Sequence, residues 1–155
     1  MTDCYTAALR ILNYRFNSEA ELRRKLAAKK FEGGEIEAAV ARLRDEKWID
    51  DERFAAAFVR TRQLKHIGRS RVRRELAAAG VAKDVAARAL AENADPERER
   101  ENLAAAIEKR RRALERRHGA GYTASREGRG KLMSYLLQKG YDSDVVRSVL
   151  HDEED

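Results

Sequence analysis

The chain has 155 residues, with 33 Lys and Arg against 27 Asp and Glu, and carries a formal net charge of +6. No stretch reaches the roughly 18 uninterrupted apolar residues that a membrane-spanning helix needs, and charge interrupts the first ten residues, so we expect neither a membrane span nor a signal peptide. Charged residues make up 39% of the chain, yet apolar residues recur at helical spacing almost throughout. That regular spacing excludes a disordered basic chain and predicts helices.

The first predicted element is an amphipathic helix near the N-terminus. Its apolar stripe is Leu9, Leu12 and Phe16, at positions i, i+3 and i+7. Cys4 lies on the same helix and is the single cysteine, so it cannot form an intramolecular disulfide. We expect Cys4 to be a small packing residue in a cytoplasmic protein.

A basic helix, a short turn closed by a large apolar residue and a second helix then form a pattern that occurs three times. Leu26, Leu76 and Leu136 hold equivalent positions, 50 and 60 residues apart. In each copy the closing apolar residue lies five positions after that leucine, at Phe31, Val81 and Tyr141. The apolar positions of the helix that follows are Ile36, Val40 and Leu43 in the first copy, Val85 and Ala89 in the second, and Val145 and Val149 in the third.

Each copy is preceded by another amphipathic helix, so the repeating unit has three helices. Phe54 and Phe58 form an i, i+4 pair before the second copy, and Leu103, Ile107 and Leu114 form a stripe before the third. We therefore predict an all-α fold of three tandem three-helix repeats that form an elongated, curved, solenoid-like array. The predicted repeats are residues 1–47, 48–94 and 95–155.

The ends of the basic helices agree with this division. Gly80 and Gly140 lie where a left-handed C-cap is needed, and Lys30 holds the corresponding position in the first copy. The spacing to the next apolar position is one residue longer in the first copy than in the other two. This predicts an extra residue in a loop at Gly33 and Gly34.

Helix starts are marked by Ser18, with Glu21 completing a capping box, and by Asp95 before Pro96. Residues 118–130 in the third repeat contain four of the nine glycines and no apolar periodicity. We expect a flexible loop there, between the first and second helices of the third repeat.

Basic side chains concentrate on equivalent helices, where nearby acids are too few to neutralise them, whereas residues 32–53 are acidic. Such runs could be solvated faces supported by i, i+4 ion pairs, or a continuous stripe that binds an anionic groove or a polyphosphate backbone. The basic helices almost lack Asn and Gln, which favours backbone binding over a base-reading helix-turn-helix. The predicted partner- or DNA-binding stripe comprises Arg23, Arg24, Arg69, Arg71, Arg73, Arg74, Lys109, Arg110, Arg112 and Arg116.

Catalysis finds little support in the sequence. His66, His118 and His151 are scattered, and none of them has metal-ligand spacing with Cys4. Asp50 and Asp51 could hold a cation as paired carboxylates, but adjacent acids at a helix start are more often caps, which is the interpretation we prefer. We expect neither an enzyme nor a metal or cofactor site.

Several stretches of the sequence together resemble one family. SEAELRRKL at residues 18–26 is followed by WIDDERFA at residues 48–55, then by Gly68 before RVRREL, then by Gly80. On these residues the chain resembles the RecX family of bacterial recombination regulators, over nearly its whole length. The resemblance implies a non-enzymatic, all-helical protein of three tandem three-helix repeats.

The resemblance also implies partners and residue roles. Members of the family bind the RecA recombinase filament on DNA, lie along its helical groove and reduce its ATPase, strand-exchange and co-protease activities. The expected partners are therefore the RecA filament and single- or double-stranded DNA contacted through phosphates, with no membrane and a monomeric protein. The alternative is a basic helical nucleic-acid-binding protein that acts without a recombinase. The expected hinge and core between repeats are Asp50, Asp51, Phe54 and Phe58, with Gly68 and Gly80 at turns.

Overall fold

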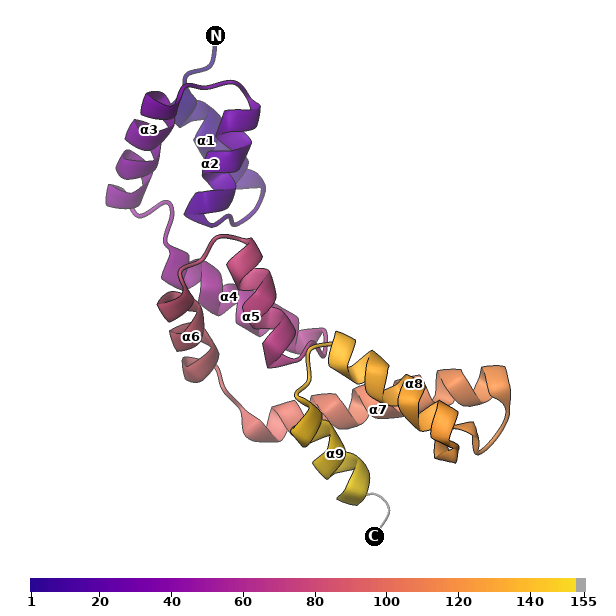
Figure 1. The fold of residues 1–155 in the computed structure, drawn as a ribbon. Coiled ribbons are helices and arrows are strands. Elements are labelled where there is room, and N and C mark those ends of the chain that lie inside the picture. The colour runs from indigo at the N-terminus through magenta and orange to yellow at the C-terminus, as the bar shows by residue number, and fades with distance from the viewer. Residues whose placement is uncertain (153–155) are drawn as a thin grey trace. The chain divides into compact units, whose positions relative to one another are not determined.

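The computed structural model describes residues 1–152, and these residues form helices and connecting turns without a strand (Figure 1). Three helices fall within each predicted repeat, so the all-α fold of three-helix repeats is confirmed. Among the described residues, no helix is both long and apolar enough to cross a membrane. The helices are α1 (Cys4–Tyr14), α2 (Glu19–Ala28), α3 (Gly33–Asp45), α4 (Asp51–Leu64), α5 (Arg69–Ala78), α6 (Lys83–Glu92), α7 (Pro96–His118), the 3₁₀ turn η1 (Tyr122–Ala124), α8 (Arg126–Gln138) and α9 (Ser143–Asp152).

The second helix of every repeat ends in the same way. The backbone amide of the closing apolar residue donates to the carbonyl of the leucine five positions earlier, and the residue just before the closing position has a positive φ. That residue is Lys30, Gly80 or Gly140, with φ of 71°, 80° and 95°. This is the hydrogen-bond pattern of the Schellman motif, so the predicted left-handed C-caps are confirmed. The bonded pairs are Phe31 with Leu26 at 3.4 Å, Val81 with Leu76 at 3.1 Å and Tyr141 with Leu136 at 3.2 Å.

The third helices of the repeats keep one register, which corrects the expected extra residue in the first copy. Gly33 and Gly34 belong to α3, and the buried residues that begin the three helices are Ile36, Ala86 and Val146. Each lies ten residues after its repeat's leucine. The expected inward position Val145 is 46% exposed, because the helix phase turns its neighbour inward instead. Val85 and Val145 were predicted to be buried because their side chains are large and apolar. The buried residue is the next one in each helix, Ala86 or Val146.

The buried face of the first helix agrees only in part with the predicted stripe. The buried residues of α1 are Cys4, Ala7 and Ala8, while Leu9 and Leu12 pack only partly against the core. Phe16 lies beyond the end of α1 and is 61% exposed, so the predicted stripe is wrong at Phe16, while Leu9 and Leu12 contact the core as predicted. Small residues on the buried face let the backbone of α1 come close to its neighbours.

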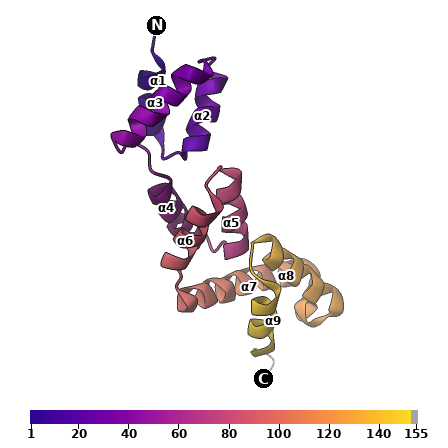
Figure 2. The ribbon, with the colours of Figure 1, turned by 60° about the vertical axis from the view of Figure 1, so that its left-hand side comes forward.

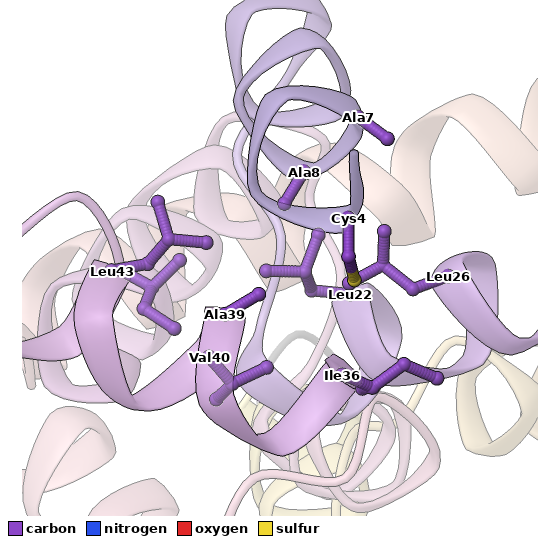
Figure 3. Close-up of a cluster of buried hydrophobic side chains, with 10 residues drawn as sticks. Cys4, Ala7, Ala8, Leu22, Leu26, Ile36, Ala39, Val40 and Leu43 are labelled. Carbon is purple, nitrogen blue, oxygen red and sulfur yellow. The ribbon is translucent and has the colours of Figure 1, made fainter. Parts of the chain in front are cut away.

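The first repeat has its own core between α1, α2 and α3, which lie side by side in both ribbon views (Figures 1 and 2). Figure 3 shows its side chains gathered between the three helices. Cys4 is 7% exposed, as expected of a packing residue, and burial raises the pKa of its thiol. The core comprises Cys4, Ala7, Ala8, Leu22, Leu26, Ile36, Ala39, Val40 and Leu43, together with Ile49 from the predicted second repeat.

The third repeat packs α7, α8 and α9 around a second core. The predicted stripe Leu103, Ile107 and Leu114 on α7 is confirmed as buried. Asp95 caps α7 by accepting from the amide of Arg98 at 3.1 Å, as the sequence predicts. The remaining core residues of this repeat are Ala106, Leu132, Leu136, Tyr141 and Val146.

The loop predicted at residues 118–130 is much shorter in the structure. Helix α7 continues to His118, η1 follows, and α8 already begins at Arg126. Ser125 caps α8 by accepting from the amide of Gly128 at 3.0 Å. Gly128 is buried, and a Cβ added there would lie 2.0 Å from the carbonyl oxygen of Tyr122. Glycine is therefore needed here for close backbone packing, not for flexibility.

Two compact units divide the described chain differently from the repeats. One contains residues 1–58 and 75–92, and the other contains residues 59–74 and the chain from residue 93 onward. Helices α4 and α5 contribute to both units. The repeat boundaries at residues 47 and 94 stay a prediction.

Candidate functional site

The two predicted cap residues at the start of α4 do different things. Asp50 accepts hydrogen bonds from the amides of Glu52 at 2.9 Å and Arg53 at 3.2 Å, so it caps α4 as expected. Asp51 instead accepts from the amide of Glu19 at 2.9 Å, at the start of α2. It thereby joins the first repeat to the second, and burial raises the pKa of its carboxyl group.

The first junction, which we define as the contact of the α2 start with the α5 end, is made by side chains. The hydroxyl of Ser18 accepts from the amide of Glu21 at 3.1 Å and donates to the carbonyl of Ala79. Arg24 donates to the carbonyl of Ala78 at 3.0 Å. Ser18 is fully buried, and the O–H of its hydroxyl finds an acceptor only because two repeats meet around it.

Gly80, one of the predicted turn glycines, lies at the same junction. A Cβ added to Gly80 would lie 2.3 Å from the Cβ of Ala20. The predicted core residue Phe54, on the same helix as Asp51, is buried. The centroid of its ring lies 5.8 Å from the ring centroid of the half-buried Phe58. The hinge role of these residues stays a prediction.

The second junction, which we define as the contact of the α5 start with the α8 end, combines backbone and side-chain hydrogen bonds, and the hydroxyl of Ser70 donates to the carboxylate of Asp142 at 2.8 Å. The amide of Gly68 donates to the carbonyl of Lys139 at 2.8 Å, and the amide of Ser70 donates to the carbonyl of Gly140 at 3.1 Å. The hydroxyl of Tyr141 adds a hydrogen bond to the carbonyl of His66 at 2.7 Å. A Cβ added to Gly68 would lie 2.3 Å from a backbone atom of Gly140, which explains this predicted glycine.

The two predicted basic residues on α2 must each break an existing interaction before they can bind a partner. Arg23 forms ion pairs with Glu37 at 2.8 Å and Glu19 at 3.4 Å, while Arg24 is committed to the first junction. Glu37 lies on α3, so the acidic segment neutralises part of the basic helix beside it.

The four predicted arginines on α5 also differ. Arg69 lies 3.6 Å from Glu99, and Arg71 is half-buried, with its Cβ and backbone against Gly140. Arg73 and Arg74 are exposed and form no ion pair within the described residues. Only these two fit the prediction of a free basic face.

The basic run on α7 contains more cations than its acids can pair. Glu108 pairs with Arg111 at 3.5 Å and with the predicted Arg112 at 2.8 Å, and Glu115 accepts a hydrogen bond from Thr123 at 3.0 Å. Four cations therefore have no carboxylate partner within the described part of the chain. They are Lys109, Arg110, Arg116 and Arg117.

Two of these four cations line a groove between α7 and α8, with a volume of about 790 Å³. Arg110 and Arg117 lie on its α7 side, and Lys131 lies on its α8 side. The guanidinium carbon of Arg110 lies 4.8 Å from the ring centroid of Tyr135, which is cation–π geometry. We call this set the α7–α8 groove.

The sequence reasoning did not single out Lys131 and Tyr135, and it left Arg117 outside the stripe. The spacing of Arg110 and Arg117, seven residues apart on one helix, was the available signal that they share a face. The facing residues on α8 have no such signal. Arg23 and Arg24 lie in one compact unit and the other predicted cations in the other, so a continuous stripe stays a prediction.

Nothing in the described residues resembles a metal centre, because no cluster of three or more His, Cys, Asp or Glu side chains is placed to hold an ion. The groups brought together are instead hydrogen-bonded junctions and unpaired cations. Such an arrangement can bind anions and position helices.

Comparison with known proteins assigns the family. The models for the first, second and third three-helix domains of RecX match residues 4–43, 50–90 and 97–150. Regulatory protein RecX of Clostridium perfringens (strain 13 / Type A) is 33% identical over 147 residues, which span 95% of this chain but 66% of that protein. Regulatory protein RecX of Serratia proteamaculans (strain 568) is 30% identical over 98% of both chains.

A solved structure agrees with these matches. The crystal structure of RecX from Lactobacillus salivarius matches with a TM-score of 0.78 and 25% identity, over 96% of this chain and 93% of that one. The resemblance seen in the sequence is thus confirmed. The chain belongs to the RecX family of regulatory proteins.

Proposed function

We propose that this protein regulates the RecA recombinase by binding its filament on DNA, without catalysis of its own. The observation that carries this proposal is the match of three consecutive RecX domains across the chain. The proposed effect is a reduction of ATPase, strand-exchange and co-protease activity. A binding protein can produce that effect without chemistry if it prefers one state of the filament.

The unpaired cations suit a partner with an acidic surface or a phosphate backbone. Arg73 and Arg74 are exposed on α5. In the proposed complex, each repeat that contacts the filament adds a modest binding energy. Linked weak contacts give an avidity that none of them has alone. The proposed site therefore consists of several small basic surfaces.

A second candidate is a nucleic-acid-binding protein that acts without a recombinase. The unpaired cations of α7 favour it, because a phosphate backbone would neutralise them without any protein partner. If the protein binds DNA alone, and the recombinase neither strengthens nor weakens that binding, the second candidate is supported over the first.

The test of the main proposal is DNA-dependent ATP hydrolysis by the cognate RecA. The wild-type protein should lower hydrolysis at concentrations below that of RecA. Arg74→Glu should raise the concentration needed for half inhibition by about fivefold, as expected for loss of a contact worth about 1 kcal/mol. Unchanged hydrolysis at excess wild-type protein would reject the proposal.

Arg88→Glu is the matched control for Arg74→Glu. Both arginines are exposed, but Arg88 is already paired with Glu52 at 3.2 Å and lies 3.6 Å from Asp84. The charge change is identical, so a general electrostatic effect would weaken both variants equally. Circular dichroism checks that both remain helical.

A further inference from the structure

We propose that the α7–α8 groove binds the phosphodiester backbone of single-stranded DNA. This inference rests on the proposed function, which it deepens by assigning direct DNA contact to one surface of the third repeat. The partner chemistry follows from the charge, the shape and the aromatic content of the groove.

The charge of the groove is positive and only partly compensated. Arg110, Arg117 and Lys131 line it, and the single carboxylate in its lining, Glu127, lies 3.5 Å from Lys131. Both arginines on the α7 side lack a carboxylate partner among the described residues. An anion with charges at regular intervals, such as a phosphodiester chain, would pair with them in succession.

Arg110 is held in place by an aromatic ring and not by an acid. Its guanidinium lies over Tyr135, and its Nε atom is covered and has no hydrogen-bond acceptor within the described residues. The side chain is thus oriented before any ligand arrives, while its donors are not used by a carboxylate. A pre-oriented guanidinium loses little freedom when it binds a phosphate.

The shape and lining of the groove favour a single strand over a duplex. Its volume, about 790 Å³, falls within the range of roughly 300–1,000 Å³ that is usual for pockets that enclose small ligands. A flexible strand can enter such a space, whereas a stiff duplex must lie across it. His118 in the lining is exposed and stacks one face of its ring on Tyr122, so its other face is open to an unpaired base, and bases within a duplex are not free to stack there.

The test is fluorescence anisotropy of a labelled oligothymidylate, about 16 nucleotides long, titrated with the full chain over a range of salt concentrations. Arg110→Gln/Arg117→Gln should weaken binding about tenfold at moderate salt. The slope of log affinity against log salt should fall by about 1.4, because each lost contact to a single strand accounts for about 0.7.

The matched control is Arg98→Gln/Arg100→Gln. These two cations lie on the same helix, are exposed and form no ion pair within the described residues, and they neither line the groove nor belong to the predicted basic stripe. The control should keep the wild-type salt slope. Lys131→Gln tests the groove from α8 through a single exposed residue, and circular dichroism confirms that each variant is folded.

Several outcomes would overturn the proposal. Equal losses in the two double variants would mean diffuse attraction to α7, and equal affinity for a duplex of the same length would remove the preference for a single strand. Displacement by polyglutamate as effective as that by unlabelled oligothymidylate would assign the groove to an acidic protein partner. No binding by the wild-type chain would reject the groove as a DNA site.

The same variants separate this proposal from the proposed function. If the wild-type protein inhibits RecA ATP hydrolysis but does not bind the oligonucleotide, the groove assignment fails and the regulatory function stands. If the oligonucleotide binds through the groove and ATP hydrolysis is unaffected, the regulatory function fails and the groove stands.

Discussion

The two repeat junctions dock the same elements with different chemistry. In both, the start of one repeat's second helix meets the end of the next repeat's second helix, at a glycine with positive φ. The first junction relies on the side chains of Ser18, Arg24 and Asp51. The second adds direct backbone–backbone hydrogen bonds to the side-chain hydrogen bonds of Ser70 and Tyr141.

The difference shows what each junction requires of the sequence. The first junction needs particular polar residues, whereas the second needs, in addition to its polar side chains, direct contact between the two backbones. Gly68 meets that second requirement, since a Cβ there would strike the backbone of Gly140. Lys30, which occupies the equivalent helix end in the first repeat, is exposed and tolerates a side chain despite its positive φ.

The largest expected effect is that of Gly140→Ala in the second junction. Alanine would be strained at a φ of 95°, and its Cβ would lie 2.5 Å from the backbone nitrogen of Arg71. Adding about 1–2 kcal/mol for the backbone and 1–3 kcal/mol for overpacking, the free energy of unfolding should fall by about 3 kcal/mol. Urea unfolding followed by circular dichroism measures this.

The control for that variant is Gly34→Ala. Gly34 lies in α3 with open space around it, so alanine should stabilise the helix by about 0.5–1 kcal/mol. If Gly140→Ala unfolds at the same urea concentration as the wild type, close backbone contact does not hold the second junction.

A smaller effect is expected from Tyr141→Phe, which removes the hydrogen bond to His66. The loss should be about 1 kcal/mol at neutral pH. Burial raises the pKa of Tyr141 from 10.0 to about 12. Because the folded-state pKa exceeds the unfolded one, this stabilisation is complete below pH 10 and is lost as the pH rises toward 12.

Unfolding curves measured between neutral pH and pH 12 therefore distinguish the variant from the wild type. The wild type should lose more stability than Tyr141→Phe over the alkaline range. Tyr14→Phe is the control, because Tyr14 is 91% exposed and its replacement should change neither curve. Parallel pH profiles for the wild type and Tyr141→Phe would contradict the prediction.

The smallest effect is expected at the helix end that forms neither junction. Lys30→Gly should raise the free energy of unfolding by up to about 1 kcal/mol, because glycine relieves a φ of 71° but loses more freedom on folding than lysine. Differential scanning calorimetry can detect the corresponding rise in Tm. A lower Tm would mean that Lys30 makes a contribution beyond its backbone conformation.

Local features were predictable because they depend on neighbours in the sequence. The helices, their recurrence and the left-handed ends at Gly80 and Gly140 follow from residue spacing and from the backbone freedom of glycine. The cap at Asp50 follows from the same local chemistry. The prediction was wrong at Val145, where a large apolar side chain was expected to be buried. It was also wrong at Gly128, where a glycine was expected to lie in a flexible loop.

The sequence predicted which helices are rich in charged residues, but not which of these residues form ion pairs. The sequence by itself determined that α7 carries more cations than nearby acids, but not that Glu108 pairs with Arg112 and leaves Arg110 to face Tyr135. Nor could it show that Glu37 neutralises Arg23.

Sequence alone thus determined the helices, the repeats and the family, since these depend on short-range periodicity and on motif order. Only the tertiary structure determined which residues form the contacts between the repeats. Ser18 and Ala79 are 61 residues apart, and Gly68 and Lys139 are further apart still, so no local spacing brings them together. Which cations remain free is likewise settled only when helices pack, because an ion pair depends on distance in space and not on separation along the chain.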